Sequence, residues 1–135
     1  MKKCHLSLEI THWVTSELSL MLNCEFSYDA QDPLAVTLVL DSDGGRPVRW
    51  IFCRQLLTEG MTARAGEGDV VLWPLLDSDG EASSFCVRVG GGERTALFEI
   101  PAEPVREWLA GTFAMVPRGT ELDGVDWDQL VQLAE

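Results

Sequence analysis

The sequence predicts an α+β fold, with two antiparallel β-sheets of about four strands each packed with helices. Apolar and polar residues alternate with a period of two in short segments up to residue 100, and Gly, Asp and Pro turns separate them. Beyond residue 100 the apolar spacing becomes helical and stays so. A strand-to-helix unit also occurs twice, at 48–59 and 95–114, which indicates two related halves. No linker separates them, so we expect a single domain over residues 1–135.

The first half contains the clearest strands. The alternation from Leu18 to Tyr28, with Cys24 and Phe26 on its apolar stripe, is typical of a long antiparallel strand with one solvated face. The other strands expected in this half are Leu6–Val14, Val36–Asp41 and Val48–Cys53, with turns at Asp29–Pro33 and Asp41–Gly45.

A short helix, Arg54–Glu59, follows the fourth strand, and the rest of the chain is organised around this junction. We expect Gly60 to be its C′ residue with a positive φ. Gly66–Gly68 is interpreted as a turn before a strand that ends near Trp73. Pro74 indicates that this strand lies at a sheet edge or bends there, and we expect its edge to be covered by a helix or a neighbouring chain.

The second half continues with two more strands and two helices. Strands are expected at Phe85–Val89 and Thr95–Ile100, after a turn at Asp77–Gly80 and around a glycine loop at Gly90–Gly92. The main helix starts near Pro104 and ends before Pro117 and Gly119. Asp126 is a candidate N-cap for a last helix that would pack through Leu130, Val131 and Leu133.

The charge of the chain argues against contact with polyanions. Twenty-two acidic residues face ten Lys and Arg, the net charge is −12, and the pI is near 4.4. Such a surface repels phosphate backbones and anionic lipid. No apolar run long enough for a secretory signal follows Lys2 and Lys3, and none approaches a membrane span of about 20 residues. We therefore expect a cytoplasmic protein without membrane insertion that binds other proteins.

No pattern predicts catalysis, a metal or a cofactor. The two histidines, His5 and His12, lack partners at the spacing that a metal site or a cysteine–histidine pair requires, and His12 is expected in the core. The Asp-Gly stretches at 41–45 and 77–80 stop short of a calcium loop and indicate turns. The four cysteines, at 4, 24, 53 and 86, are interpreted as reduced.

The tryptophans allow two interpretations. Trp108 lies on the apolar face of the main helix and is expected in the core. Trp50 and Trp73 are either buried within the chain or covered by another subunit, since aromatic residues are favoured at interfaces.

Several runs of the sequence resemble the SsgA-like proteins of actinomycetes, closest to the SsgB branch. The match extends from about Leu18 to the C-terminus, and no single run is diagnostic. Two departures are Leu34, where the family tends to have an aromatic residue, and Gln55, where it often has Asp. The runs are 32–36 (DPLAV), 48–52 (VRWIF), 54–60 (RQLLTEG), 66–70 (GEGDV), 73–74 (WP), 96–99 (ALFE), 108–109 (WL) and 116–121 (VPRGTE).

The resemblance implies a non-enzymatic role in sporulation-specific cell division. Such proteins are associated with marking septum sites and recruiting the tubulin-like protein FtsZ, so the expected partners are FtsZ and a septum-site or membrane partner. The chain would then be recruited from the cytoplasm to the division septum. The implied fold is similar to the whirly single-stranded nucleic-acid binders, and the implied assembly is a homotrimer.

For partner contact we single out three residues of the central junction as surface candidates: Arg54, Glu59 and Trp73. The alternative is that they are solvated or serve self-association. If Trp73 lies at a subunit interface, Trp73→Arg should give monomers in light scattering. The alternative function is a single-stranded nucleic-acid-binding module. That function requires a basic groove with stacking aromatics, which the acidic composition opposes.

Overall fold

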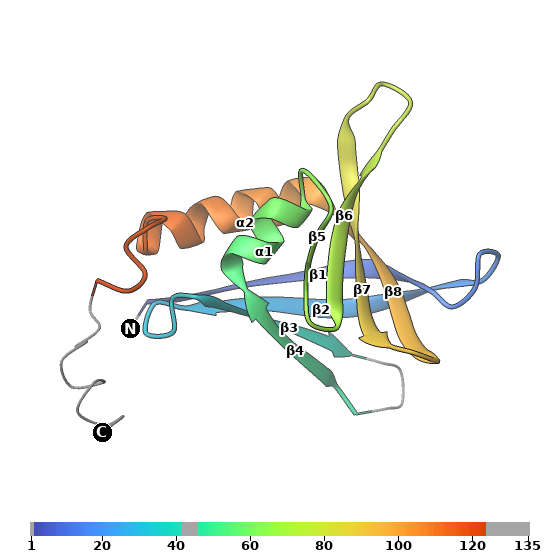
Figure 1. Cartoon of the computed structure of the whole chain (residues 1–135), viewed down its shortest axis with the longest axis horizontal. Helices are drawn as coiled ribbons and strands as arrows, with labels where there is room; N and C mark the ends of the chain where they lie inside the picture. The colour runs from blue at the N-terminus through green and yellow to red at the C-terminus, as the bar shows by residue number, and fades with distance from the viewer. Residues whose placement is uncertain (1, 42–45, 124–135) are drawn as a thin grey trace.

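The computed structural model describes residues 2–41 and 46–123. Within these residues, eight strands form one antiparallel sheet in the order β4-β3-β2-β1-β8-β7-β6-β5, accompanied by two helices (Figure 1). In chain order the elements are β1 (Lys3–Trp13), β2 (Ser19–Asp29), β3 (Ala35–Asp41), β4 (Val48–Cys53), α1 (Arg54–Gly60), β5 (Ala65–Glu67), β6 (Val70–Leu76), β7 (Ala82–Gly91), β8 (Arg94–Pro101) and α2 (Ala102–Met115).

The prediction of two separate sheets is wrong. The chain does form two four-strand meanders, β1–β4 and β5–β8, each followed by a helix, as the internal symmetry indicated. However, β1 pairs with β8 where Thr11–Trp13 faces Leu97–Glu99, and this pairing joins the halves into one sheet. In Figure 1 the β6–β7 ribbon crosses β1 and β2 steeply, so the sheet is strongly twisted at this junction.

The segment Ala65–Glu67 is a strand, although the sequence indicated a turn there. It pairs with Val70–Leu72, and Gly68 makes the tight connection with a φ of 59°. Three residues that include a glycine carry little strand signal, so only the partner strand decides their conformation. We expected the edge of β6 to be covered by a helix or a neighbouring chain. Instead β5 covers part of it, and the rest of β6, Trp73–Leu76, extends beyond β5.

Gly60 has a different role from the predicted one. It is the last residue of α1 and does not have a positive φ, because Met61 is the C-cap. A Cβ on Gly60 would collide with Cβ of Leu72 on β6. The glycine is required for the close approach of α1 to the sheet, and this contact places the helix against the second half.

The core lies between one face of the sheet and the two helices. The period-two stripe of β2 buries Cys24, Phe26 and Tyr28, as the sequence predicted. On α2, Trp108 packs against Phe26 with ring centroids 5.6 Å apart, which confirms its assignment to the core. All four cysteines are free.

The remaining predictions concern the ends of elements. Helix α2 agrees with the predicted helix within two residues at its start, and it follows β8 directly. The turn around Asp77 and Gly80 is present, with Gly80 at a φ of 78°. The turn predicted at 41–45 and the helix predicted from Asp126 lie largely or wholly outside the described residues.

In the part of the chain that the structure describes, neither helix is long and apolar enough to cross a membrane.

Candidate functional site

Arg54 begins α1 immediately after β4, and its side chain turns into the protein. Its backbone N–H donates to the Leu34 carbonyl at 2.7 Å, which fixes the strand-to-helix turn. The side chain is only 1% exposed. Its Nη1 donates to the Thr112 carbonyl at 3.0 Å, and its Nη2 lies 3.3 Å from Oε2 of Glu121. Arg54 thus connects α1 to the end of α2 and to the segment that follows it.

Two aromatic rings complete the surroundings of this guanidinium. Its carbon lies 4.1 Å from the ring centroid of Phe113 and 4.9 Å from that of Tyr28, both within cation–π range. Hydrogen bonds from the backbone N–H groups of Glu121 and Gly119, together with Arg54, hold the pKa of the Glu121 carboxyl below its ordinary value. The prediction that Arg54 lies on the surface is therefore wrong, because its guanidinium is buried and makes all these contacts inside the fold.

The other two candidates lie apart from Arg54 and from each other. Glu59 is exposed on α1 and accepts a hydrogen bond from Nε2 of Gln55 at 3.2 Å. Trp73 is half-buried on β6, with the Arg64 guanidinium 5.2 Å from its ring centroid. Since Leu72 faces α1, its neighbour Trp73 faces the opposite side of the sheet. The structure does not bring the three residues into one site.

An apolar groove lies on the face of the sheet that carries the core. The helices cover this face at one end, and the same stripes continue uncovered toward the β1–β2 hairpin. The groove has a volume of about 850 Å³. It is lined by His12, Leu20, Met21, Leu22, Leu40, Val48, Trp50, Val89, Gly90, Arg94, Thr95, Ala96 and Phe98.

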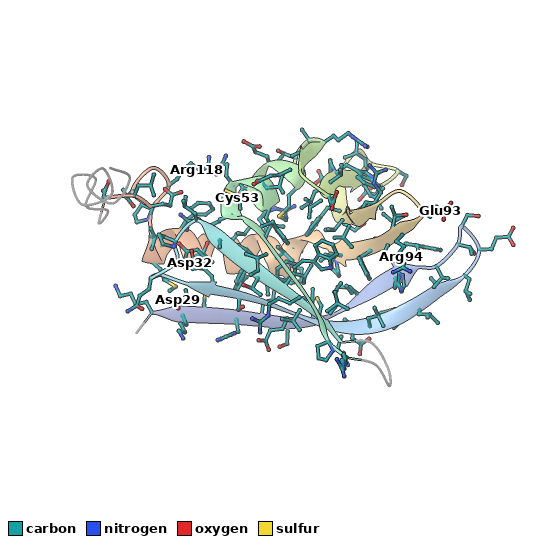
Figure 2. The ribbon with its side chains drawn as sticks, turned by 60° about the horizontal axis from the view of Figure 1, so that its bottom comes forward. Asp29, Asp32, Cys53, Glu93, Arg94 and Arg118 are labelled. Carbon is teal, nitrogen blue, oxygen red and sulfur yellow. The ribbon has the colours of Figure 1, made fainter. Side chains whose placement is uncertain are left out.

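The groove leaves apolar side chains exposed to solvent, and their burial against another surface would be energetically favourable. Leu20 on β2 is 50% exposed and Val48 on β4 is 46% exposed, and both line the groove. His12 is only partly buried, contrary to the expectation of a core histidine, and it stacks on Phe98 at 4.8 Å. Arg94 supplies a cationic side chain at the end near the β1–β2 hairpin (Figure 2). An exposed apolar patch of this kind marks a binding surface.

The β1–β2 hairpin extends past the rest of the sheet (Figure 1). Its turn is closed by hydrogen bonds from the N–H groups of Val14 and Thr15 to the Leu18 carbonyl. Val14 is 46% exposed and Leu18 is 51% exposed. The hairpin therefore carries two exposed apolar side chains, on either side of the polar turn residues 15–17, beside an apolar hollow.

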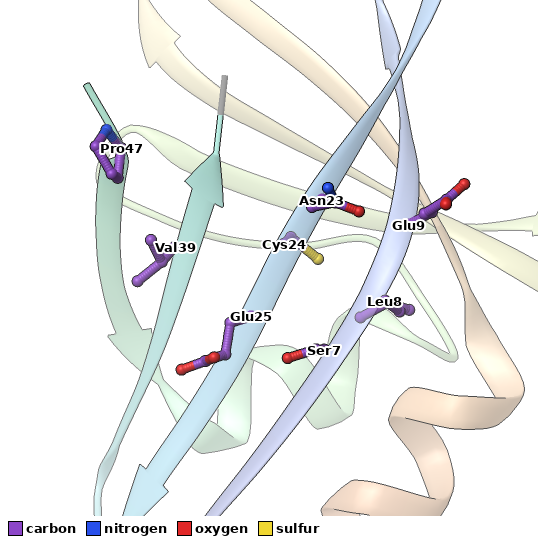
Figure 3. Close-up of a pocket in the computed structure, with 8 residues that line it drawn as sticks. All are labelled: Ser7, Leu8, Glu9, Asn23, Cys24, Glu25, Val39 and Pro47. Carbon is purple, nitrogen blue, oxygen red and sulfur yellow. The ribbon is translucent and has the colours of Figure 1, made fainter. Parts of the chain in front are cut away.

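The opposite face of the first meander is polar. Ser7, Glu25 and Val39 form one cross-strand row on β1, β2 and β3, and Figure 3 shows them beside a shallow pocket there. Glu25 is 3.3 Å from Nδ1 of His5, and Lys3 pairs with Asp29. These exposed pairs are worth little energetically, and the face is typical of a solvated surface. Among the described residues no group of three His, Cys, Asp or Glu side chains is arranged to hold a metal ion.

The sequence patterns did not predict that the groove residues come together on one surface. One signal was available: the apolar stripe of β2 continues to Leu20, beyond the part of the sheet that a 14-residue helix covers. The contributions of Arg94, Ala96 and Phe98 depend on the β1–β8 pairing, which joins residues more than 80 positions apart. No local pattern shows that contact.

The matching family model, the sequence relatives and the similar solved structures all belong to the SsgA-like sporulation and cell division proteins. The family model described as "Streptomyces sporulation and cell division protein, SsgA" matches residues 22–121. The sporulation-specific cell division protein SsgB of Streptomyces coelicolor is 38% identical over 93% of this chain and 89% of its own length. The SsgB protein of Thermobifida fusca is 32% identical over 93% of this chain and 88% of its own.

Two solved structures share the fold. The crystal structure of an SsgA-like sporulation-specific cell division protein from Thermobifida fusca superposes with a TM-score of 0.84 at 27% identity, covering 99% of this chain and 96% of that one. A Streptomyces coelicolor structure, from work on SsgB mutations that correlate with longitudinal cell division during sporulation, gives a TM-score of 0.80. It is 36% identical and covers 89% of this chain and 93% of that one.

Proposed function

Because the chain belongs to the SsgA family of sporulation and cell division proteins, we propose that it is a non-enzymatic adaptor in sporulation-specific cell division. In this role it helps to mark septum sites and recruits FtsZ, through a homotrimer that is brought from the cytoplasm to the division septum. The apolar groove is the observation that carries the proposal, because an adaptor requires binding surface and no reacting group.

The groove and the neighbouring hairpin support self-association. A hairpin that carries exposed apolar side chains and an apolar hollow on the same chain fit a head-to-tail contact, which closes into a ring when the rotation allows it. The edge strand β4 adjoins the groove and carries Val48 and Trp50 on its groove side. Burying these side chains against a neighbouring copy removes apolar surface from water, at about 25 cal/mol per Å².

Light scattering on two matched variants tests the assembly. Val48→Glu places a charge at the groove, whereas Ile51→Glu places the same charge on the opposite face of the same strand, where Ile51 is 61% exposed. We expect the wild type and Ile51→Glu to have a mass near 45 kDa, three times 14.9 kDa, and Val48→Glu to be monomeric. A monomeric wild type, or equal dissociation of both variants, would refute the groove as the subunit interface.

Co-sedimentation with polymerised FtsZ tests the adaptor role, with single-stranded DNA binding measured in the same buffer. The proposal expects the protein to pellet with FtsZ polymers and to leave DNA unbound. Salt-sensitive DNA binding without contact to FtsZ would overturn it in favour of a nucleic-acid-binding module. Co-sedimentation by a monomeric wild type would retain the adaptor and reject the trimer.

A further inference from the structure

A pocket between Trp13 and Trp73 lies on the sheet face opposite the helices, in the half where β1, β8, β7 and β6 run side by side. The register places Thr11, Glu99, Cys86 and Trp73 in one cross-strand row. Trp13 lies two residues along β1 from Thr11, so its side chain shares this face. The strands that carry Trp13 and Trp73 are three spacings apart, and Trp13 is displaced by two residues along β1, so the two backbones are about 16 Å apart.

The two indoles stand at opposite sides of a pocket of about 540 Å³. Cys86, Leu97 and Glu99 from the strands between them form its floor, and Leu75 contributes beside Trp73. Both tryptophans are only partly buried, so their rings are open to a ligand. A planar group bound between the two indoles can therefore stack on one of them at a time.

Glu99 places a negative charge on this floor and is held there by two hydrogen bonds. Trp13 Nε1–H donates to Oε1 at 3.1 Å, and the Ser84 hydroxyl donates to Oε2 at 3.2 Å. A carboxylate has about four acceptor positions, so both oxygens can accept further bonds. Burial, with Glu99 beside it, raises the pKa of the Cys86 thiol to about 11 and leaves that thiol neutral. Among the described residues that line the pocket, Glu99 is consequently the only charged one.

We propose that this pocket binds an arginine side chain of a partner peptide, with the guanidinium on the Glu99 carboxylate and its plane against the indole of Trp73. A guanidinium is planar, donates in a fork that matches a carboxylate, and stacks on aromatic faces, whereas an ammonium pairs with a carboxylate only as a compact point charge. The proposal rests on the proposed function as an adaptor, and it names the chemistry of the partner.

The chain itself supplies a precedent for this contact. The guanidinium carbon of Arg64 lies 5.2 Å from the ring centroid of Trp73, although Arg64 does not line the pocket. Trp73 thus already presents a ring face to a guanidinium. An anionic ligand such as a nucleic acid is disfavoured by Glu99 and by the net charge of −12.

The probe is the peptide acetyl-Gly-Gly-Arg-Gly-Gly-amide, compared with the same peptide in which citrulline replaces arginine. Citrulline keeps the shape and the planar head group but carries no charge. Binding to the full-length chain is followed by NMR, using the indole N–H signals of the five tryptophans. We expect the arginine peptide to shift the Trp13 and Trp73 signals and to leave those of Trp50 and Trp108 in place.

Two variants and a control separate this site from general attraction to an acidic protein. We expect Glu99→Gln to weaken arginine binding about tenfold, as expected for loss of a charge-assisted hydrogen bond. Trp73→Leu removes one wall without touching the Glu99 hydrogen bonds and should also weaken binding, so it serves if Glu99→Gln does not fold. Glu107→Gln on the exposed side of α2 removes the same charge elsewhere and should leave binding unchanged.

Several outcomes would overturn the proposal. These are equal binding of the citrulline peptide, equal loss in Glu99→Gln and Glu107→Gln, and shifts spread over all tryptophans. Absence of any shift at millimolar peptide would do so as well. Each of these results leaves the FtsZ sedimentation test independent, because a pocket without arginine affinity still permits an adaptor that binds FtsZ through another surface.

Discussion

The buried Arg54 predicts a large loss of stability when its side chain is truncated. Arg54→Ala removes the hydrogen bonds to Thr112, leaves the Glu121 carboxylate without its cation, and opens a cavity against Phe113 and Tyr28. Breaking a buried ion pair typically costs about 3–5 kcal/mol. Glu121 retains 14% side-chain exposure, so water can partly solvate it and the lower part of that range applies. We expect a loss of about 3–4 kcal/mol.

The assay is urea unfolding followed by tryptophan fluorescence, since Trp108 lies in the same core. Arg106→Ala is the control, because Arg106 is an exposed arginine whose only described hydrogen bond reaches Ala82 at 3.5 Å, and it should cost less than about 0.5 kcal/mol. The double variant Arg54→Met with Glu121→Gln should cost less than the sum of its single changes, because neither charge is then left alone.

A loss below about 1 kcal/mol for Arg54→Ala would refute the reasoning, as would strict additivity in the double variant. The first result would mean that the guanidinium is solvated in solution. The second would mean that Arg54 and Glu121 do not interact. Either result would restore Arg54 as a candidate surface residue.

Two further predictions concern stability. Gly60→Ala should destabilise the fold by about 1–3 kcal/mol in the same assay, because the new Cβ meets Leu72 Cβ on β6, and an unchanged midpoint would show that α1 can move away. Glu121 has a pKa lowered from 4.5, so its contribution is fully present above that value and is lost as the pH falls through the lower folded-state pKa. The stability difference between the wild type and Glu121→Gln should therefore shrink below about pH 4.5, and a difference that is constant between pH 7 and pH 3 would contradict this assignment.

Much of the fold could be predicted from local patterns. The alternation in 18–28 specifies β2 because a strand with one buried face needs that period, and the helical spacing after residue 100 specifies α2. Local runs also carry the resemblance to the SsgA family, which matches residues 22–121. These signals need only neighbouring residues.

The candidate sites could not be predicted in the same way, because each depends on residues that are distant in the sequence. Arg54 was expected on the surface, and only the fold brings Thr112 and Glu121 to it, 58 and more positions away. Trp73 was singled out, but its pocket depends on Trp13 and Glu99, which are 86 positions apart. The groove arises because α2 covers only part of the apolar sheet face, whose β2 stripe continues to Leu20.

The sequence by itself determined every described strand except β5, both described helices, the acidic composition and the family, since periodicity, composition and local runs carry that information. Only the tertiary structure decided that the two meanders form one sheet, that Gly60 serves contact rather than a turn, and that Arg54 is buried. The physical reason is that strand pairing and close packing are non-local. A short pairing between β1 and β8 is enough to set which faces meet, and therefore where the groove and the tryptophan pocket lie.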